Sequence, residues 1–222
     1  FRFMQPDAGF EAFKKDGDPM QYGEKAFTVR ASVHTILQCE RLVLNCMQRM
    51  SGIATLTHRY AEKLKPYKTK LLDTRKTLPG LRIAQKYAVA VGGGKNHRLG
   101  LFDAFLIKEN HILAAGSIAN AVAQAHRIAP GKPVEVEVET LDEMREAIQA
   151  QADIVMLDNF SPEAMTQAVR LARSLSTQVK LEASGNINDQ TLLPYAQTGV
   201  DYISIGALTK DCKAIDLSMR LV

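Results

Sequence analysis

The hydrophobic pattern of the chain divides it into a long helix followed by short alternating elements. Between residues 39 and 60, apolar side chains recur at steps of three and four, which predicts an amphipathic helix. Before it, a strand is expected at 27–33. After it, apolar runs predict strands at 70–72, 104–107, 134–138, 154–157, 179–181 and 202–205. The stretches between them predict helices at 81–91, 118–128, 141–150, 162–175 and 189–197. This alternation is typical of parallel strands joined by helical crossovers.

Polar side chains gather where the predicted strands end. Asp73, Lys108 and Asp158 follow three of them, and serine–glycine turns at 184–186 and 204–206 follow the last two. In an α/β barrel the carboxyl ends of the strands form the active site, and an open doubly wound sheet also binds ligands there. Either architecture therefore predicts a polar site at this edge.

The segment 134–139 alternates valine with glutamate, so the three valines face one way and the three glutamates the other. In a half-exposed sheet, this pattern indicates a strand with one solvent-exposed face. In a barrel, helices cover the outside, so the valines point outward and the glutamates inward. Buried carboxylates need partners. Lys108 and Lys180 are expected to supply them.

Positive charge is concentrated in the middle of the chain. The net charge is +4, and the segment 73–111, with seven basic and three acidic residues, carries the whole excess. These cations lie among glycine, proline, histidine and asparagine, which favours a pocket for small anions over a solvated helix face. Aromatic residues are 6% and tryptophan is absent, so a stacking surface for nucleic acid is disfavoured.

Two glycine-rich features invite a phosphate-binding interpretation. The run at 92–94 precedes Lys95, but Asn96 stands where a P-loop needs serine or threonine, and no Rossmann pattern is present. We therefore expect a glycine hinge that presents His97 and Arg98. The turns at 184–186 and 204–206, by contrast, let backbone N–H groups approach an anion closely and favour a phosphate site.

The remaining composition limits where the protein works. No apolar run reaches the ~18 residues of a membrane span, and no secretory signal is visible. Cys39, Cys46 and Cys212 have no metal-ligand spacing, so they are interpreted as free thiols packed in the core of a cytoplasmic protein. His34, His58 and His126 are interpreted as surface or packing residues.

These motifs together resemble the quinolinate phosphoribosyltransferase family. The resemblance runs from about residue 14 to the end, through segments 40–41, 44–45, 48–49, 51–55, 73–77, 92–98, 108–112, 134–139, 157–159, 182–187 and 199–209. It implies an incomplete, TIM-like α/β barrel of the type II phosphoribosyltransferases over 41–210. Residues 1–40 would be a remnant of a longer N-terminal α/β sandwich domain, against which 211–222 packs.

The resemblance also implies a reaction. Such enzymes join quinolinate to phosphoribosyl pyrophosphate and release pyrophosphate and CO2, which yields nicotinate mononucleotide for NAD synthesis. Arg75, His97, Arg98 and Lys108 would hold the quinolinate carboxylates, with Thr74 and Lys76 beside them. Arg41 would reach into the site of a neighbouring subunit, in a homodimer or a higher oligomer.

The sugar donor would occupy the rest of the site. By the same resemblance, Glu137 and Asp158 would contact its ribose hydroxyls and its Mg2+, directly or through water, and would act with Lys108 in catalysis. The 5′-phosphate would lie against the two turns, formed by Ser184, Gly185, Asn186, Ser204, Ile205 and Gly206.

Three alternatives remain at this point. A nicotinate phosphoribosyltransferase or a molybdenum-transport-associated relative would share the barrel, although Arg75, Arg98 and Lys108 together favour a dicarboxylate. A phosphosugar isomerase or a non-catalytic phosphate-binding barrel would explain the serine–glycine turns but not the two carboxylates, Glu137 and Asp158. An anion-binding scaffold without chemistry is the third.

Overall fold

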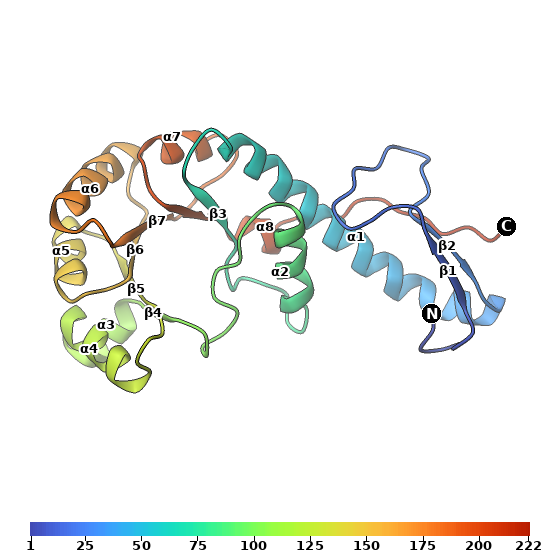
Figure 1. Cartoon of the computed structure of the whole chain (residues 1–222), viewed down its shortest axis with the longest axis horizontal. Coiled ribbons are helices and arrows are strands. Elements are labelled where there is room, and N and C mark those ends of the chain that lie inside the picture. The colour runs from blue at the N-terminus through green and yellow to red at the C-terminus, as the bar shows by residue number, and fades with distance from the viewer.

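A computed structural model describes all 222 residues. Its strands are β1 (Gly9–Ala12), β2 (Phe27–Arg30), β3 (Lys70–Leu72), β4 (Phe105–Ile107), β5 (Val134–Val138), β6 (Ile154–Asp158), β7 (Lys180–Ser184) and β8 (Tyr202–Ser204). Its helices are α1 (Val33–Leu64), α2 (Arg82–Val91), α3 (Glu109–Ala115), α4 (Ile118–Ile128), α5 (Leu141–Gln149), α6 (Pro162–Leu175), α7 (Leu192–Gln197) and α8 (Ala207–Lys210). Figure 1 shows the sheet with its helices at one end of an elongated molecule, and the β1–β2 hairpin at the other.

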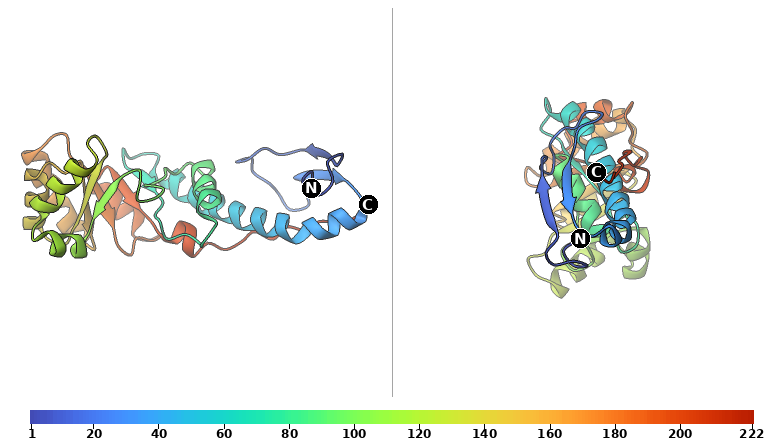
Figure 2. Two further views of the ribbon diagram at one scale, coloured as in Figure 1. Left: turned by 90° about the horizontal axis from the view of Figure 1, so that it is seen from below. Right: turned by 90° about the vertical axis from the view of Figure 1, so that its right-hand side faces the viewer.

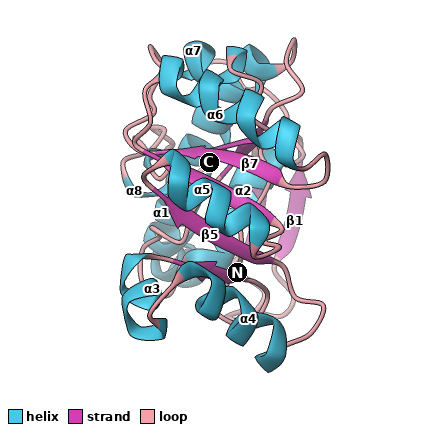
Figure 3. Ribbon diagram, turned by 90° about the vertical axis from the view of Figure 1, so that its left-hand side faces the viewer, coloured by secondary structure: helices cyan, strands magenta, loops and turns pink.

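The six strands from β3 onward form one curved parallel sheet in the order β3-β8-β7-β6-β5-β4. Helices α4 to α7 cover its outer face (Figures 1 and 3), as expected for a barrel rather than a doubly wound sheet. Beyond β3, Leu72 makes a parallel bridge to Lys95, which adds a short extended piece to the sheet. Pairing ends there and at β4, so the ring stays open. The predicted incomplete α/β barrel is confirmed.

Strand alternation decides what fills the inside of this sheet. Val134, Val136 and Val138 are almost wholly buried against the outer helices. Glu135, also buried, points the other way, toward His97. The predicted inward orientation is therefore confirmed for Glu135 and, two residues further along β5, for Glu137, whereas Glu139 lies beyond the end of the strand and is exposed.

Of the two lysines predicted to pair with the inward glutamates, one does so. Lys108 pairs with Glu137. Lys180 does not pair with a glutamate, because it stands at the amino end of β7, away from the strand ends that carry the site. Its Nζ instead lies 3.4 Å from Oδ1 of Asp201.

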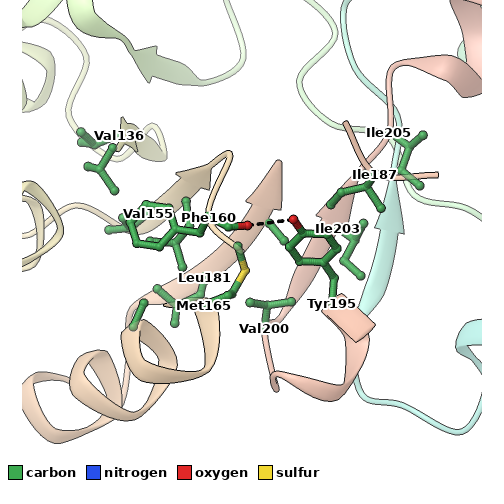
Figure 4. Packing of buried hydrophobic residues seen from close by; sticks show 14 of the residues in the cluster. Val136, Val155, Phe160, Met165, Leu181, Ile187, Tyr195, Val200, Ile203 and Ile205 are labelled. Carbon is green, nitrogen blue, oxygen red and sulfur yellow. Dashed lines mark hydrogen bonds between the residues drawn. The ribbon is translucent and has the colours of Figure 1, made fainter. Parts of the chain in front are cut away.

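The main core lies between the sheet and its outer helices. Figure 4 shows Val155 and Leu181 from neighbouring strands packing with Met165 of α6. The Tyr195 hydroxyl donates a hydrogen bond of 2.8 Å to the carbonyl oxygen of Phe160, so this aromatic ring is buried with its polar end satisfied. Three of the outer helices, α4, α5 and α6, begin at a hydroxyl side chain that caps them. Ser117, Thr140 and Ser161 each accept a hydrogen bond from the backbone N–H three residues on.

Helix α1 begins earlier than predicted because Ser32 caps it, so the strand expected at 27–33 ends at Arg30. The helix links the barrel to the antiparallel hairpin of β1 and β2 (Figure 2). The predicted domain boundary at residue 40 thus falls inside this one helix. None of the helices combines the length and apolar character needed to cross a bilayer. The strand β1 and the short helices α3 and α8 were not predicted.

The C-terminal segment 211–222 runs back along α1, so both termini lie at the hairpin end (Figures 1 and 2). The Ile215 N–H donates to the Gln48 carbonyl oxygen at 2.9 Å, and the Gln48 amide donates to the carbonyl oxygen of Leu217. A Cβ on Gly52 would lie 2.0 Å from the carbonyl oxygen of Lys213. Glycine is therefore required where the segment crosses the helix.

We predict that Gly52→Ala detaches this segment, because the added methyl would collide with backbone. Overpacking of this kind costs about 1–3 kcal/mol, so the unfolding temperature should fall and the amide of Ile215 should exchange faster with deuterium. Gly9→Ala is the control, since a Cβ there meets Arg30 at an ordinary 3.5 Å. Equal stability of the two variants would refute the prediction.

Candidate active site

The carboxyl ends of the six parallel strands carry the predicted site residues. Each strand ends in, or within a few residues of, a side chain with polar chemistry: Arg75, Lys108, Glu137, Asp158, Ser184 and Ser204. Because parallel strands present their carboxyl ends at one edge, six separate segments of the chain meet there.

Buried Asp73 fixes the loop that follows α2. Its Oδ1 accepts hydrogen bonds from Lys86 Nζ at 2.5 Å and from the His97 N–H at 2.8 Å. The Lys86 ammonium also donates to the His97 carbonyl oxygen at 2.8 Å. With its side chain 1% exposed, Lys86 is a structural cation and does not face a ligand.

Two of the three glycines in the predicted hinge, Gly92 and Gly94, pack tightly against neighbouring helices. A Cβ on Gly92 would lie 2.5 Å from the carbonyl oxygen of Ala54, and one on Gly94 would lie 2.8 Å from the side chain of Thr57. They are small because the loop packs tightly on α1. The loop nevertheless presents His97 and Arg98 at the site, as the sequence predicts.

The imidazole of His97 is held at both nitrogens. Its Nδ1 accepts the backbone N–H of Arg98 at 2.8 Å. Its Nε2 lies 2.9 Å from Oε2 of Glu135 and 3.6 Å from Oε2 of Glu182. Burial lowers the pKa of His97 despite the nearby Glu182, so the ring is neutral at pH 7.

Two carboxyl groups, Glu135 and Glu182, form the floor beneath His97. Burial is the main cause that raises the pKa of Glu135 to about 7. Burial, and then the neighbouring Glu135, raise the pKa of Glu182 well above its usual value. The pair therefore holds at least one proton at neutral pH. Both residues are absent from the predicted site, although strand alternation would have placed them on the inner face.

Cations line the rim above this floor. Burial, and then the adjacent Arg75, lower the pKa of the Arg98 guanidinium, while Glu135 opposes this shift. The buried Nε of Arg75 has no hydrogen-bond partner. Lys108 forms an ion pair with Glu137 and remains partly exposed. The predicted cluster of Arg75, Arg98 and Lys108 is thus brought together around Glu135.

The turn after β7 and the end of β6 form a second part of the site. Asp158 and Ser184 are register partners, and the Asn159 amide donates to Oδ2 of Asp158 at 2.7 Å. A Cβ on Gly185 would lie 2.2 Å from Oδ1 of Asn159, and Gly185 has φ +98°. Glycine is therefore necessary, and Asn186 beside it adopts a positive φ of 49°.

The turn after β8 lies against the segment that follows β3. A Cβ on Gly206 would lie 2.9 Å from the Lys76 side chain and 3.5 Å from the Thr74 hydroxyl. Buried Ser204 precedes this turn, while the Ile205 N–H donates to the carbonyl oxygen of Leu72. Of the predicted phosphate-binding residues, Ile205 thus has its N–H engaged within the sheet.

Arg41 stands apart from all these residues. It lies on α1, its side chain is 66% exposed, and its guanidinium is 3.5 Å from Oε1 of Glu40. Within one chain, the structure does not bring it to the strand ends.

Two family models together match nearly the whole chain. The model of the N-terminal domain of quinolinate phosphoribosyl transferase matches residues 1–51, and that of the C-terminal domain matches residues 53–220. The chain belongs to the quinolinate phosphoribosyltransferase family. In the curated proteins, it is 42% identical over 224 residues to a probable nicotinate-nucleotide pyrophosphorylase [carboxylating] of Synechocystis, covering 100% of this chain and 76% of that protein. A protein of the same name from Bacillus subtilis is 45% identical, covering 93% of this chain and 71% of its own.

Solved structures of the family share this architecture. The nicotinate-nucleotide pyrophosphorylase of Francisella tularensis superposes with a TM-score of 0.92 at 51% identity, over 98% of this chain and 76% of that one. NadC of Streptococcus pyogenes gives a TM-score of 0.91 at 44% identity, over 99% and 77%. The resemblance seen in the sequence is thereby confirmed for the family and the fold.

The buried carboxyl pair predicts an unusual dependence of stability on pH. Glu182 keeps its proton in the folded chain but loses it near pH 4.5 in the unfolded chain. Above pH 4.5, wild-type stability should therefore fall by up to about 1.4 kcal/mol per pH unit until the folded group also ionises.

Glu182→Gln removes this contribution. The free energy of unfolding of the variant relative to wild type should rise as the pH increases from 4.5 to 8, measured by urea denaturation at each pH. A difference that does not change with pH would show that Glu182 ionises normally in the folded protein.

Proposed function

We propose that this chain transfers the phosphoribosyl group of phosphoribosyl pyrophosphate to quinolinate. The products are nicotinate mononucleotide, pyrophosphate and CO2, and the reaction is a step in NAD biosynthesis. Membership of the family supports the reaction class. The observation that carries the assignment of substrate is the cation cluster of Arg75, Arg98 and Lys108 at the strand ends.

Quinolinate is a dicarboxylate, and this cluster suits two carboxylates. An arginine fork binds one carboxylate through two parallel hydrogen bonds. The buried Nε of Arg75 has no hydrogen-bond acceptor, and Arg75 lies close enough to Arg98 to lower its pKa. A bound dianion would relieve the repulsion between these guanidinium groups, whereas a monocarboxylate would relieve less of it.

The sugar donor would lie over the carboxylates of β5 and β6. Glu137 and Asp158 end neighbouring strands and offer the oxygen ligands that Mg2+ prefers. Both remain partly accessible, so they fit a Mg2+ carried by the donor, held directly or through water. Bound there, the ion would neutralise charge on the pyrophosphate leaving group. When the donor binds, Glu137 must give up its ion pair with Lys108 and contact the donor instead.

The chemistry follows from placing the two reactants side by side. Departure of pyrophosphate leaves positive charge on the ribose, which the carboxylates of Glu137 and Asp158 can stabilise. The pyridine nitrogen of quinolinate forms the new bond and becomes positive. This charge stabilises the carbanion that remains on the adjacent ring carbon when its carboxylate leaves as CO2, and a proton from solvent then adds to that carbon. Lys108, which belongs to the cation cluster and pairs with Glu137, can contact both reactants, so positioning provides much of the rate.

The two serine–glycine turns would hold the 5′-phosphate of the donor. Gly185 and Gly206 leave no room for a side chain, so backbone can approach the phosphate closely. Thr74 and Lys76 adjoin the second turn, and the Lys76 ammonium can add a positive charge there. The sequence predicted that Thr74 and Lys76 lie beside the quinolinate carboxylates. We now propose that they lie beside the 5′-phosphate.

The oligomer and the compartment are also proposals. Exposed Arg41 supports a homodimer in which it reaches the neighbouring site, since nothing within its own chain but Glu40 engages it. Three free cysteines support a reducing compartment such as the cytoplasm. Relatives from plants are named chloroplastic in Arabidopsis thaliana and mitochondrial in Nicotiana glauca.

A nicotinate-specific enzyme is the nearest alternative, and one assay separates the two. Quinolinate consumption should require both phosphoribosyl pyrophosphate and Mg2+, stop on chelation with EDTA and return with added Mg2+. Release of one CO2 for each pyrophosphate identifies the decarboxylating reaction. Turnover of nicotinate but not of quinolinate would contradict the proposal.

Arg98→Ala tests the division of the site. We expect the Kd for quinolinate to rise roughly 30-fold or more, because a half-buried charged contact is lost, while the Kd for phosphoribosyl pyrophosphate changes about two-fold at most. Isothermal titration calorimetry with each ligand gives both values. Arg127→Ala, on the exposed surface of α4, is the matched control. Equal losses for both ligands would contradict the assignment of Arg98.

A further inference from the structure

A set of buried groups beneath the cation cluster has no role in the chemistry described above. Glu135 and Glu182 are at most 2% exposed and face each other inside the barrel. Without a shared proton, Oε1 of Glu135 and both oxygens of Glu182 would have no hydrogen-bond partner. Two carboxyl groups below a site for a dianion are electrostatically unfavourable, so their presence needs an explanation.

The hydrogen bonds around His97 supply that explanation. Nδ1 accepts the Arg98 N–H, so the ring proton is on Nε2, from which it points to Oε2 of Glu135 at 2.9 Å. Both nitrogens are then engaged inside the protein. The chain of contacts runs from the carboxyl pair, through the imidazole, to the backbone of Arg98, whose side chain belongs to the cation cluster.

We propose that Glu135 is a positioning residue for quinolinate: it fixes the tautomer and orientation of His97, which in turn places Arg98. Glu182 completes the pair. Oε2 of Glu135 acts as a hydrogen-bond acceptor in this role. His97 accordingly acts through Arg98, and its ring N–H does not bind a substrate carboxylate. This inference rests on the proposed function, because it concerns the quinolinate side of the site.

A metal ion is the other way to satisfy these oxygens. The ligand atoms of His97, Glu135 and Glu182 lie within 4.8 Å of one another. Lys86 and Arg98, however, are close enough to His97 to lower its pKa, and their positive charges would repel a cation. The N–H donated to Nδ1 and the short Nε2 contact to Glu135 also favour a protonated Nε2, which cannot bind a metal.

Two substitutions at Glu135 separate positioning from charge. Glu135→Gln and Glu135→Ala both remove the carboxyl group, but only glutamine retains an oxygen that can accept from His97. We expect the KM for quinolinate to rise about ten-fold or more in Glu135→Ala and about three-fold at most in Glu135→Gln. The KM for phosphoribosyl pyrophosphate should change no more than about two-fold in either variant.

Val136→Ala is the matched control, because it truncates a buried side chain on the outward face of the same strand. It should lower the unfolding temperature and leave both KM values near wild type. If Glu135→Ala raised both KM values together, or if Gln and Ala behaved alike, the positioning role would be wrong.

A measurement without substrate completes the test. In the wild-type protein, 15N NMR of the His97 ring should show a neutral imidazole with its proton on Nε2, and Glu135→Ala should change that signal. A proton on Nδ1, or one equivalent of transition metal lost in His97→Gln, would overturn the inference. A confirmed tautomer in a protein that does not turn over quinolinate would leave the His97–Glu135 contact intact and refute the proposed function instead.

Discussion

The central electrostatic constraint in this structure is that two guanidinium groups, those of Arg75 and Arg98, lie close together at the carboxyl ends of the barrel strands. Arg75 and Arg98 lie near enough, and buried enough, for the pKa of Arg98 to fall. Placing guanidinium groups side by side is unfavourable because they repel each other, and a bound dianion would offset this repulsion. In the proposed function, the site therefore favours ligands with two negative charges.

A layer of carboxyl groups beneath the cations offsets this repulsion. Asp73 holds the ammonium of Lys86 and the backbone of His97 on one side, and Glu135 holds the His97 ring on the other. Each carboxyl group comes from a different strand, or follows one, so the barrel fixes their separation. Glu137 and Asp158 lie nearer the strand ends, where in the proposed function they would face the second substrate.

Much of this architecture could be predicted from the sequence. The alternation of valine and glutamate in β5 correctly placed Glu135 inside, and the alternation of strands with helices correctly predicted the parallel sheet. Glu182 was missed as a site residue because its role depends on Glu135 from another strand, a contact that no local pattern reveals. Lys180 was assigned the wrong partner because alternation gives the face of a strand but not the end of the barrel. The glycines at 92–94 look like a hinge in sequence, and only the proximity of α1 shows that Gly92 and Gly94 are tightly packed.

The most direct test of this account is a crystal structure of the protein with quinolinate bound. We expect the two carboxylates of quinolinate to lie against the guanidinium groups of Arg75 and Arg98, near Lys108, with the pyridine nitrogen directed toward Glu137 and Asp158. Quinolinate bound away from these arginines, or with its nitrogen directed away from the carboxylates, would contradict it.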